Sequence, residues 1–175
     1  IHTHYTMFQK EFILIDTAGI RRKNKEKDDL EFYSIIRAIK AMDEADVCLL
    51  VVDATKGVTA QDLSIFSLAS KKGKGIVVLI NKWDLIEKET NTARDYEKVV
   101  KEKLAPFTDV PIIFISALTK QRIFKAIETA VSIDKNRSNR IPTRKLNDTL
   151  LPIMESQPPP SYKGKFVKIK FCTQL

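Results

Sequence analysis

The chain has 175 residues, of which 43% are hydrophobic and 30% are charged, a composition typical of a globular protein with room for one domain and part of a second. No apolar run approaches the ~20 residues that a membrane helix needs, and the first residues lack the charged and apolar regions of a signal peptide, so we expect a cytoplasmic protein without a membrane partner. The net charge of +8 is uneven, because residues 135–175 hold nine Lys or Arg residues against two acidic residues.

Strand-like and helix-like runs alternate over the first 134 residues. Strands are predicted at residues 2–8, 11–16, 47–53, 75–81 and 111–117. Helices are predicted at residues 28–45, 59–72 and 92–104, and from residue 119 onward. The first two strands are too close in sequence for a crossover and should pair antiparallel, whereas the last three show little alternation, as expected for strands that are covered on both faces. This order predicts an α/β fold with a doubly wound, mostly parallel sheet.

A second unit is predicted after a polar, basic linker at residues 135–142. A helix should run from 143 to 155, although Pro152 is expected to kink or shorten it. The run KFVKIKF, within residues 162–175, then predicts a strand with a basic aspect. One helix and one strand cannot close a core, so we expect residues 143–175 to be the first part of a second domain.

The positive charge of this second unit indicates contact with a polyanion such as the phosphate backbone of RNA. The alternative is a solvated cationic tail. The candidate RNA contacts are Arg140, Arg144, Lys145, Lys163, Lys165, Lys168 and Lys170.

Polar clusters follow three of the predicted buried strands. Asp16-Thr17-Ala18-Gly19 follows FILI, Asn81-Lys82-Trp83-Asp84 follows VVLI, and Ser116-Ala117 follows IIFI. Because the carboxyl ends of parallel strands meet at one edge of a sheet, we expect the three clusters at that edge, where ligands bind in open α/β sheets.

The last two clusters match the chemistry of a guanine ring. Asp84 offers two acceptor oxygens for the paired N–H donors of guanine, which adenine lacks. Asn81 can bind the imidazole side of the ring or brace a neighbouring loop, and the stem of Lys82 can lie along the planar base with its ammonium in water. Backbone N–H groups around Ala117 can donate to the guanine carbonyl oxygen.

The first cluster matches the phosphate end of a nucleotide. Asp16 is a hard oxygen ligand that is expected to hold Mg²⁺ through water. Gly19 lacks a side chain, so that the backbone can approach a terminal phosphate.

In this order and spacing the three clusters resemble the third, fourth and fifth nucleotide-binding motifs of P-loop GTPases of the translation-factor type, over residues 1–134. A closer resemblance spans the whole chain. The segments DTAGIRRK, VVDATKGVTAQD, NKWDL and IPTRKLND…PPP…GKFVKIKF are similar to the bacterial Der (EngA) family of GTPases. Proteins of that family carry two tandem G domains and a C-terminal KH-like domain, and they act in the assembly of the large ribosomal subunit.

The resemblance implies that residues 1–134 are part of the second G domain and that residues 143–175 begin the KH-like domain. It implies a GTP-hydrolysing ribosome-assembly factor that binds GTP or GDP, Mg²⁺ and K⁺, with the large ribosomal subunit or its rRNA as partner. The nucleotide-binding residues that it implies are Asp16, Gly19, Asn81, Lys82, Asp84, Ser116, Ala117 and Leu118.

The sequence departs from the family at the phosphate end. No G-x-x-x-x-G-K-[ST] loop occurs, and the threonine of the first switch segment would precede Ile1. We therefore expect a truncated piece, without the first G domain of the same chain, that binds GTP weakly or not at all and does not hydrolyse it. The alternative is a non-catalytic RNA-binding protein on a degenerate G-domain scaffold.

The second switch segment also differs from that of Ras-like enzymes. Where they place a water-orienting glutamine, this chain has Ile20, next to Gly19 and near the expected γ-phosphate. We assign no general base, and the resemblance implies that K⁺ assists instead. The basic run Arg21-Arg22-Lys23-Asn24-Lys25 would lie in this segment or form a solvated loop.

Overall fold

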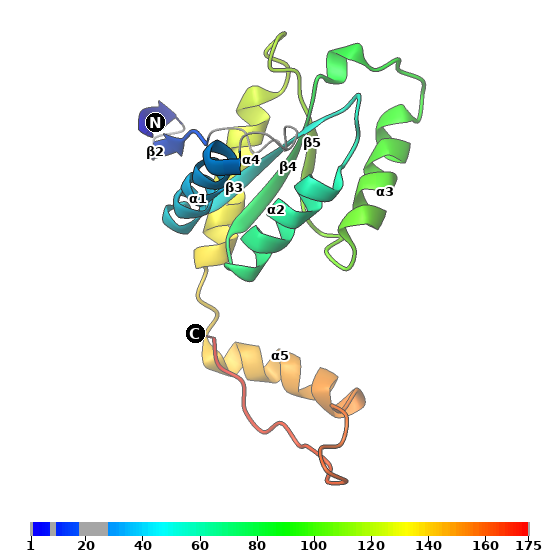
Figure 1. The fold of residues 1–175 in the computed structure, drawn as a ribbon. Coiled ribbons are helices and arrows are strands. Elements are labelled where there is room, and N and C mark those ends of the chain that lie inside the picture. The colour runs from blue at the N-terminus through cyan, green and yellow to red at the C-terminus, as the bar shows by residue number, and fades with distance from the viewer. Residues whose placement is uncertain (1, 8–9, 18–27, 175) are drawn as a thin grey trace. The chain divides into compact units, whose positions relative to one another are not determined.

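The computed structural model describes residues 2–7, 10–17 and 28–174, with the backbone alone over residues 28–35 (Figure 1). The chain divides into two units, residues 1–137 and residues 138–175. None of the helices in these described ranges is long and apolar enough to cross a lipid bilayer.

The larger unit contains a parallel sheet and a separate hairpin. Strands β3 (Val47–Asp53), β4 (Gly75–Asn81) and β5 (Ile112–Phe114) lie in the order β3-β4-β5 and are parallel. Strands β1 (His2–Met7) and β2 (Lys10–Ile15) pair antiparallel with each other. Both predicted pairings are confirmed, but only β4 is buried along its length on both faces: β1 and β2 are largely exposed, and β3 leaves Leu49 and Val51 exposed.

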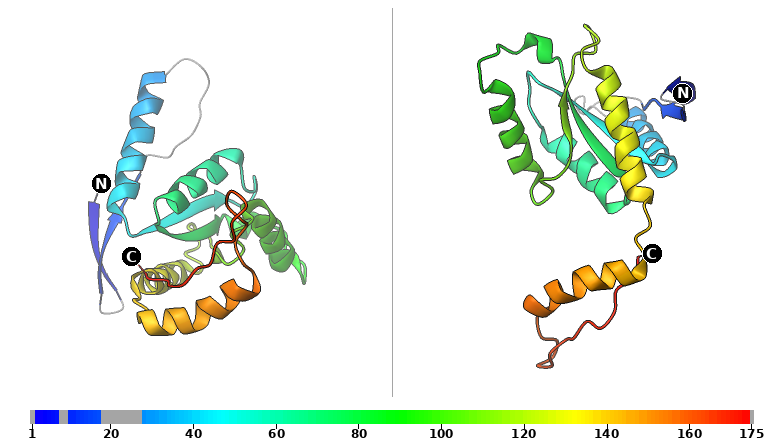
Figure 2. Two further views of the ribbon diagram at one scale, coloured as in Figure 1. Left: turned by 90° about the horizontal axis from the view of Figure 1, so that it is seen from below. Right: turned by 180° about the vertical axis from the view of Figure 1, so that it is seen from behind.

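Helices cover both faces of the parallel sheet (Figure 2). Helices α2 (Ala60–Lys71) and α3 (Thr92–Leu104) pack on one face, and α4 (Ile123–Ser138) packs on the other. Helix α1 (Asp28–Glu44) precedes β3. The most deeply buried side chains of the sheet are Val52, Val77, Val78 and Ile80. Each such side chain contributes about 1.5–3 kcal/mol through burial, so the parallel sheet is the stable centre of this unit.

Helix α2 begins with the capping box that the sequence predicts. The Thr59 hydroxyl accepts a hydrogen bond from the Asp62 N–H at 3.3 Å, and the Asp62 carboxylate accepts one from the Thr59 N–H at 2.8 Å. These two bonds satisfy donors that the first turn of a helix leaves open. They fix the loop that follows β3 on the side of the sheet where β3 ends.

The predicted linker is shorter than expected, because α4 continues through residues 135–138. Arg137 pairs with Asp134 one turn earlier, at 3.1 Å, and with Asp46, which precedes β3, at 2.6 Å. These ion pairs hold the last turn of the helix against the end of the sheet. Residues 139–142 alone remain as the connection between α4 and the next helix.

In the smaller unit, helix α5 (Thr143–Ser156) includes Pro152 and continues past it, so the predicted shortening does not occur. The predicted strand is not formed either. Residues 166–174 run back along α5 without regular secondary structure, because no partner strand lies beside them in the described part of the chain. The Asn147 side chain holds the segment by donating to the Cys172 carbonyl and accepting from the Cys172 N–H, both at 2.8 Å.

Candidate base-reading site at the carboxyl edge of the sheet

The carboxyl edge of the parallel sheet brings the ends of β3, β4 and β5 together. Asp53 and Asn81 are neighbours in the strand register, and the Asn81 carbonyl accepts a hydrogen bond from the Ala54 N–H at 2.8 Å. Beyond β5, the Ile115 N–H donates to the Ile80 carbonyl at 2.8 Å, which carries the chain to Ser116 at the same edge. The structure therefore places the second and third polar clusters side by side.

Asn81 braces the loop that follows β5. Its side-chain oxygen accepts a hydrogen bond from the Ala117 N–H at 3.0 Å, which is one of the two roles considered for this amide. Because this donor is engaged, Ala117 is not the free N–H that the sequence suggested for a carbonyl oxygen. The neighbouring Leu118 N–H has no acceptor within the described residues, and its side chain is 84% exposed.

Ser116 closes this loop from beneath. It is fully buried, and its hydroxyl accepts a hydrogen bond from the Thr119 N–H at 3.1 Å. Its backbone forms two hydrogen bonds with Gln121. A larger side chain at this position would displace the buried contacts, so Ser116 shapes the loop.

Asp84 lies in a short 3-10 turn, η1 (Trp83–Leu85), that directly follows Lys82. Trp83 fixes this turn, since its ring is 4% exposed and packs against Phe114 at 4.2 Å and Tyr96 at 5.4 Å between centroids. Asp84 Oδ1 is buried and has no hydrogen-bond partner within the described chain. A buried carboxylate oxygen without a donor is costly, so this atom indicates a position that a ligand donor would satisfy.

Lys82 does not leave its ammonium free in water as the sequence suggested. Its backbone adopts a left-handed conformation, with φ of 62°, and its Nζ donates to Asp53 Oδ2 at 2.7 Å. The other oxygen of Asp53 accepts from the Thr55 N–H at 3.0 Å and from the Thr55 hydroxyl at 2.7 Å. The Lys82 hydrogen bond first, and then that of the Thr55 hydroxyl, hold the pKa of Asp53 far below its usual range.

Asp53 is the site residue that the sequence analysis missed. The available signal was that β3, like β4, ends in a polar residue directly after a buried run, VCLLVVD. The residues after it are also fixed, because the Tyr96 hydroxyl donates to the Ala54 carbonyl at 3.0 Å. Burial, and then the Asp53 carboxylate, raise the pKa of Tyr96, which keeps that hydroxyl a donor.

A groove of 970 Å³ separates the hairpin from the parallel sheet. Its walls include Ile13 of β2, Met42 of α1 and Val51 of β3, and Asp16 and Asp53 both line it. Val51 is 55% exposed, on the face of β3 opposite to the buried Leu50 and Val52, and β3 has an edge that pairs with no strand in the described residues. The groove therefore combines an open strand edge with two carboxylates.

Asp16 directly follows β2 and is exposed, and β2 pairs in the hairpin and not in the parallel sheet, so the first cluster does not share the edge of that sheet as predicted. The described residues provide no cluster of three His, Cys, Asp or Glu side chains for a metal. One carboxylate holds Mg²⁺ only together with water and substrate phosphates, a donor set in which Asp16 fits. Gly19, Ile20 and the run 21–25 lie outside the described residues.

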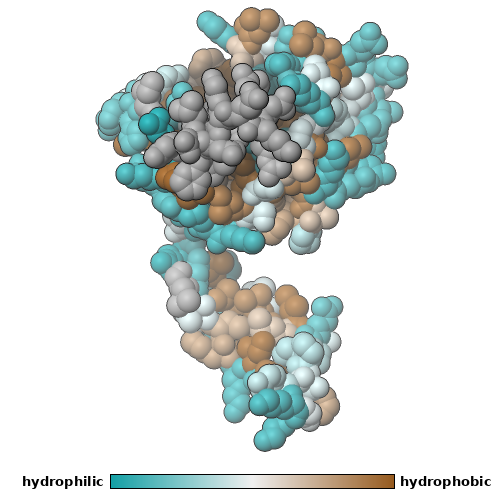
Figure 3. All heavy atoms as spheres, viewed as in Figure 1, coloured by the Kyte–Doolittle hydropathy of each residue, from teal (hydrophilic) through white to brown (hydrophobic). Residues whose placement is uncertain are grey.

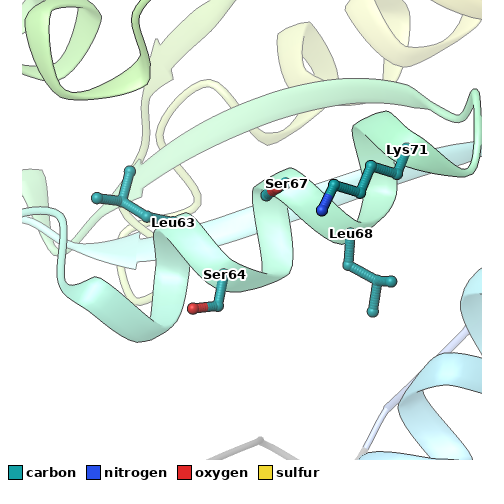
Figure 4. A pocket seen from close by; sticks show the side chains of 5 residues that line it. All are labelled: Leu63, Ser64, Ser67, Leu68 and Lys71. Carbon is teal, nitrogen blue, oxygen red and sulfur yellow. The ribbon is translucent and has the colours of Figure 1, made fainter.

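A second, shallow hollow lies along the outer surface of α2 (Figure 4). The side chains that line it all come from this one helix: Leu63, Ser64, Ser67, Leu68 and Lys71. Groups from a single helix face do not converge on a ligand in the way that a binding site requires. We therefore assign the site to the sheet edge.

The cations of the smaller unit are exposed, and some pair within it. The Arg144 side chain is 94% exposed and lies 3.8 Å from Asp148, and Lys168 lies 3.9 Å from Glu155. Lys163 lies over the Tyr162 ring at 5.4 Å. Arg140, Lys145, Lys165 and Lys170 are exposed as well. Apolar residues gather on the visible face of this unit (Figure 3). Tyr162, Phe166 and Phe171 are exposed, so the surface offers both positive charge and aromatic rings.

Comparisons with known proteins agree with this geometry. Residues 2–136 match the family described as "Elongation factor Tu GTP binding domain", and residues 140–175 match "KH-domain-like of EngA bacterial GTPase enzymes, C-terminal". Two curated relatives named "GTPase Der", from Christiangramia forsetii and Flavobacterium psychrophilum, are 59% and 58% identical to all of this chain. The chain spans 40% of the length of each relative.

Two solved structures are similar to the chain. Era in complex with MgGDPNP and nucleotides 1506–1542 of 16S ribosomal RNA is 27% identical, with a TM-score of 0.64 over 75% of this chain and 43% of that one. Elongation factor SelB from Methanococcus maripaludis, in complex with the GTP analogue GPPNHP, shares the fold at 22% identity, with a TM-score of 0.61 over 80% of this chain and 28% of that one. With a translation-factor GTP-binding domain followed by an EngA-type KH-like region, the chain belongs to the Der (EngA) family of bacterial GTPases.

Proposed function

We propose that this chain carries the guanine-reading part of a GTPase that acts in assembly of the large ribosomal subunit. The observation that carries the proposal is the buried, unpartnered Oδ1 of Asp84 at the carboxyl edge of the sheet. Guanine presents paired N–H donors to such a carboxylate, and adenine presents none in that arrangement. The Leu118 N–H, next to the loop that Asn81 braces, is the donor left for the guanine carbonyl oxygen.

The phosphate end of the nucleotide lies toward the groove in this proposal. Asp16 would hold Mg²⁺ through water beside the terminal phosphates, and Gly19 would let the backbone approach them. With Ile20 in place of a glutamine, water activation would depend on K⁺ or on another group of the whole protein. The 175 residues alone would bind the base weakly and would not hydrolyse GTP, because they contain no phosphate loop.

Base reading can be tested on the 175-residue chain without phosphates. We expect millimolar guanosine to shift the backbone amide NMR signals of Asp84 and Leu118, whereas adenosine leaves them unchanged. Inosine, which lacks the exocyclic amine, should bind more weakly than guanosine because it offers Asp84 one donor instead of two. Equal shifts with guanosine and adenosine would show that Asp84 does not distinguish the two bases.

Nucleotide affinity needs a longer protein. A suitable one is a chimera in which this chain replaces the matched region of the Christiangramia forsetii relative. The match covers 40% of that relative, and the chimera keeps the rest of its sequence. This fusion protein is called the chimera. Tight GTP binding by the chimera would favour the GTPase over a non-catalytic RNA-binding protein.

We propose further that the smaller unit contacts RNA of the large ribosomal subunit. Its charge and the Era complex with 16S ribosomal RNA, which is RNA of the small subunit, support contact with ribosomal RNA in general, and the choice of the large subunit rests on the resemblance to the Der family. Changing Lys163, Lys165 and Lys168 to Gln should make the binding constant for large-subunit rRNA less sensitive to salt. The negative slope of its logarithm against log salt should become shallower by about 2, because each phosphate contact contributes about 0.7 to the size of the slope.

The matched control changes three exposed lysines of the larger unit, Lys88, Lys98 and Lys125, to Gln. This triple variant loses the same charge and should keep the slope. If both triple variants flatten it equally, the smaller unit contributes only its share of the net charge and is a solvated tail.

A further inference from the structure

We propose that Asp53 is a positioning residue for the base-reading site. Its carboxylate holds the Lys82 side chain where the nucleotide base can lie against that side chain. The inference rests on the proposed guanine site and adds to it a residue from a neighbouring strand. Its basis is the 2.7 Å contact between Lys82 Nζ and Asp53 Oδ2, which joins the ends of β4 and β3.

Asp53 is itself held from several sides. Its Oδ1 accepts two hydrogen bonds from Thr55, and its carbonyl accepts from the N–H groups of Lys56 and Gly57 at 3.1 and 3.0 Å. Its side chain is 19% exposed, whereas that of Lys82 is 49% exposed. The carboxylate is therefore the fixed partner, and the long lysine side chain is the one that is ordered by the contact.

The contact directs the stem of Lys82 across the strand ends. Lys82 follows β4, and its ammonium reaches the end of β3, so the methylene groups between them span the carboxyl edge. Asp84 lies two residues after Lys82, in the turn that Trp83 begins, with its unpartnered oxygen in the same loop. When the N–H donors of a planar ring bind Asp84, the ring needs an apolar surface beside it. The methylene groups of Lys82 provide that surface when the side chain is held in this position.

Without Asp53 the lysine side chain would sample several rotamers, and each binding event would have to order it again. The expected loss is modest, because a half-exposed ion pair is weak in water. It should also be confined to the base end of the nucleotide. GMP and GDP should therefore lose affinity by the same factor when the contact is removed.

The test is a double-mutant cycle in the chimera, with GDP affinity measured by calorimetry. Asp53→Asn keeps an oxygen for both Thr55 hydrogen bonds and removes only the acceptor for Lys82. Lys82→Met keeps an unbranched stem and removes the ammonium. We expect each single variant to bind GDP about fivefold more weakly, and the double variant to bind no more weakly than either.

The matched control is Asp46→Asn, at the opposite end of β3, where the carboxylate pairs with Arg137 at 2.6 Å. It should leave GDP affinity unchanged. Thermal unfolding of every variant identifies a loss that comes from misfolding, and Lys82→Met probes the contact from its exposed side if Asp53→Asn fails to fold.

Each outcome separates the two proposals. Tight GDP binding with additive losses for Asp53→Asn and Lys82→Met overturns the positioning role and leaves the guanine site standing. Losses that differ between GMP and GDP also overturn it. If the unsubstituted chimera discriminates no guanine nucleotide from adenine nucleotides, the guanine site fails, and the role of Asp53 fails with it.

Discussion

Replacing Asp84 by Asn is expected to turn a guanine site into a xanthine site. The substitution keeps one acceptor oxygen and replaces the other with an amide that donates. Guanine then meets a donor where it also offers one, whereas xanthine carries a carbonyl oxygen at the position of the guanine amine. In the chimera we expect GTP to bind about 10²–10⁴-fold more weakly and XTP to bind more tightly than it does to the unsubstituted protein.

The size of this effect follows from the burial of the carboxylate. Oδ1 of Asp84 is buried with no donor from the described chain, so a ligand that satisfies it supplies a charge-assisted hydrogen bond away from bulk water. The control is Asp109→Asn, an exposed carboxylate in the loop before β5. It should change neither affinity. GTP binding that survives Asp84→Asn would show that this carboxylate does not read the base.

The parts of the fold that the sequence predicted well are those set by local patterns. The bounds of β3, β4 and α3 agree with the predicted ranges. The two strands are uninterrupted apolar runs that end at Asp53 and Asn81, and the helix is a periodic run that ends just before Pro106. Such signals depend on neighbouring residues alone.

The failures depend on partners that are distant in sequence. The run KFVKIKF has the composition of a strand, but a strand needs a neighbour, and none lies beside it in the described residues. Helix α4 continues to Ser138 because Arg137 reaches Asp46, 91 residues away. No local pattern contains that contact.

The site shows the same division. Asp84 and Asn81 could be proposed from the sequence because their types and spacing match the chemistry of a guanine ring. Asp53 was missed because its role depends on the parallel register that places it beside Asn81, and on the turn that aims Lys82 back across the edge. The engaged Ala117 N–H was missed for the same reason, since its acceptor comes from another strand.

The chimera is expected to bind GDP at least a thousandfold more tightly than the 175-residue chain does, from millimolar or weaker to micromolar or tighter. That gain is about 4 kcal/mol, which two or three hydrogen bonds to charged phosphates can supply. We place the segment that supplies them in the groove between β2 and β3. Each of these strands has an edge there without a partner in the described residues, so an added strand would find backbone donors and acceptors.

The substitution Val51→Lys tests that placement, because Val51 belongs to edge strand β3, is 55% exposed and lines the groove. A lysine there should remove most of the gain, since its charge would be buried by the incoming segment. Val99→Lys on α3, at a valine that is 52% exposed, is the matched control and should leave GDP binding unchanged. If the chimera with Val51→Lys binds GDP as tightly as the unsubstituted chimera, the phosphate-binding segment does not lie against β3, and the groove has another occupant.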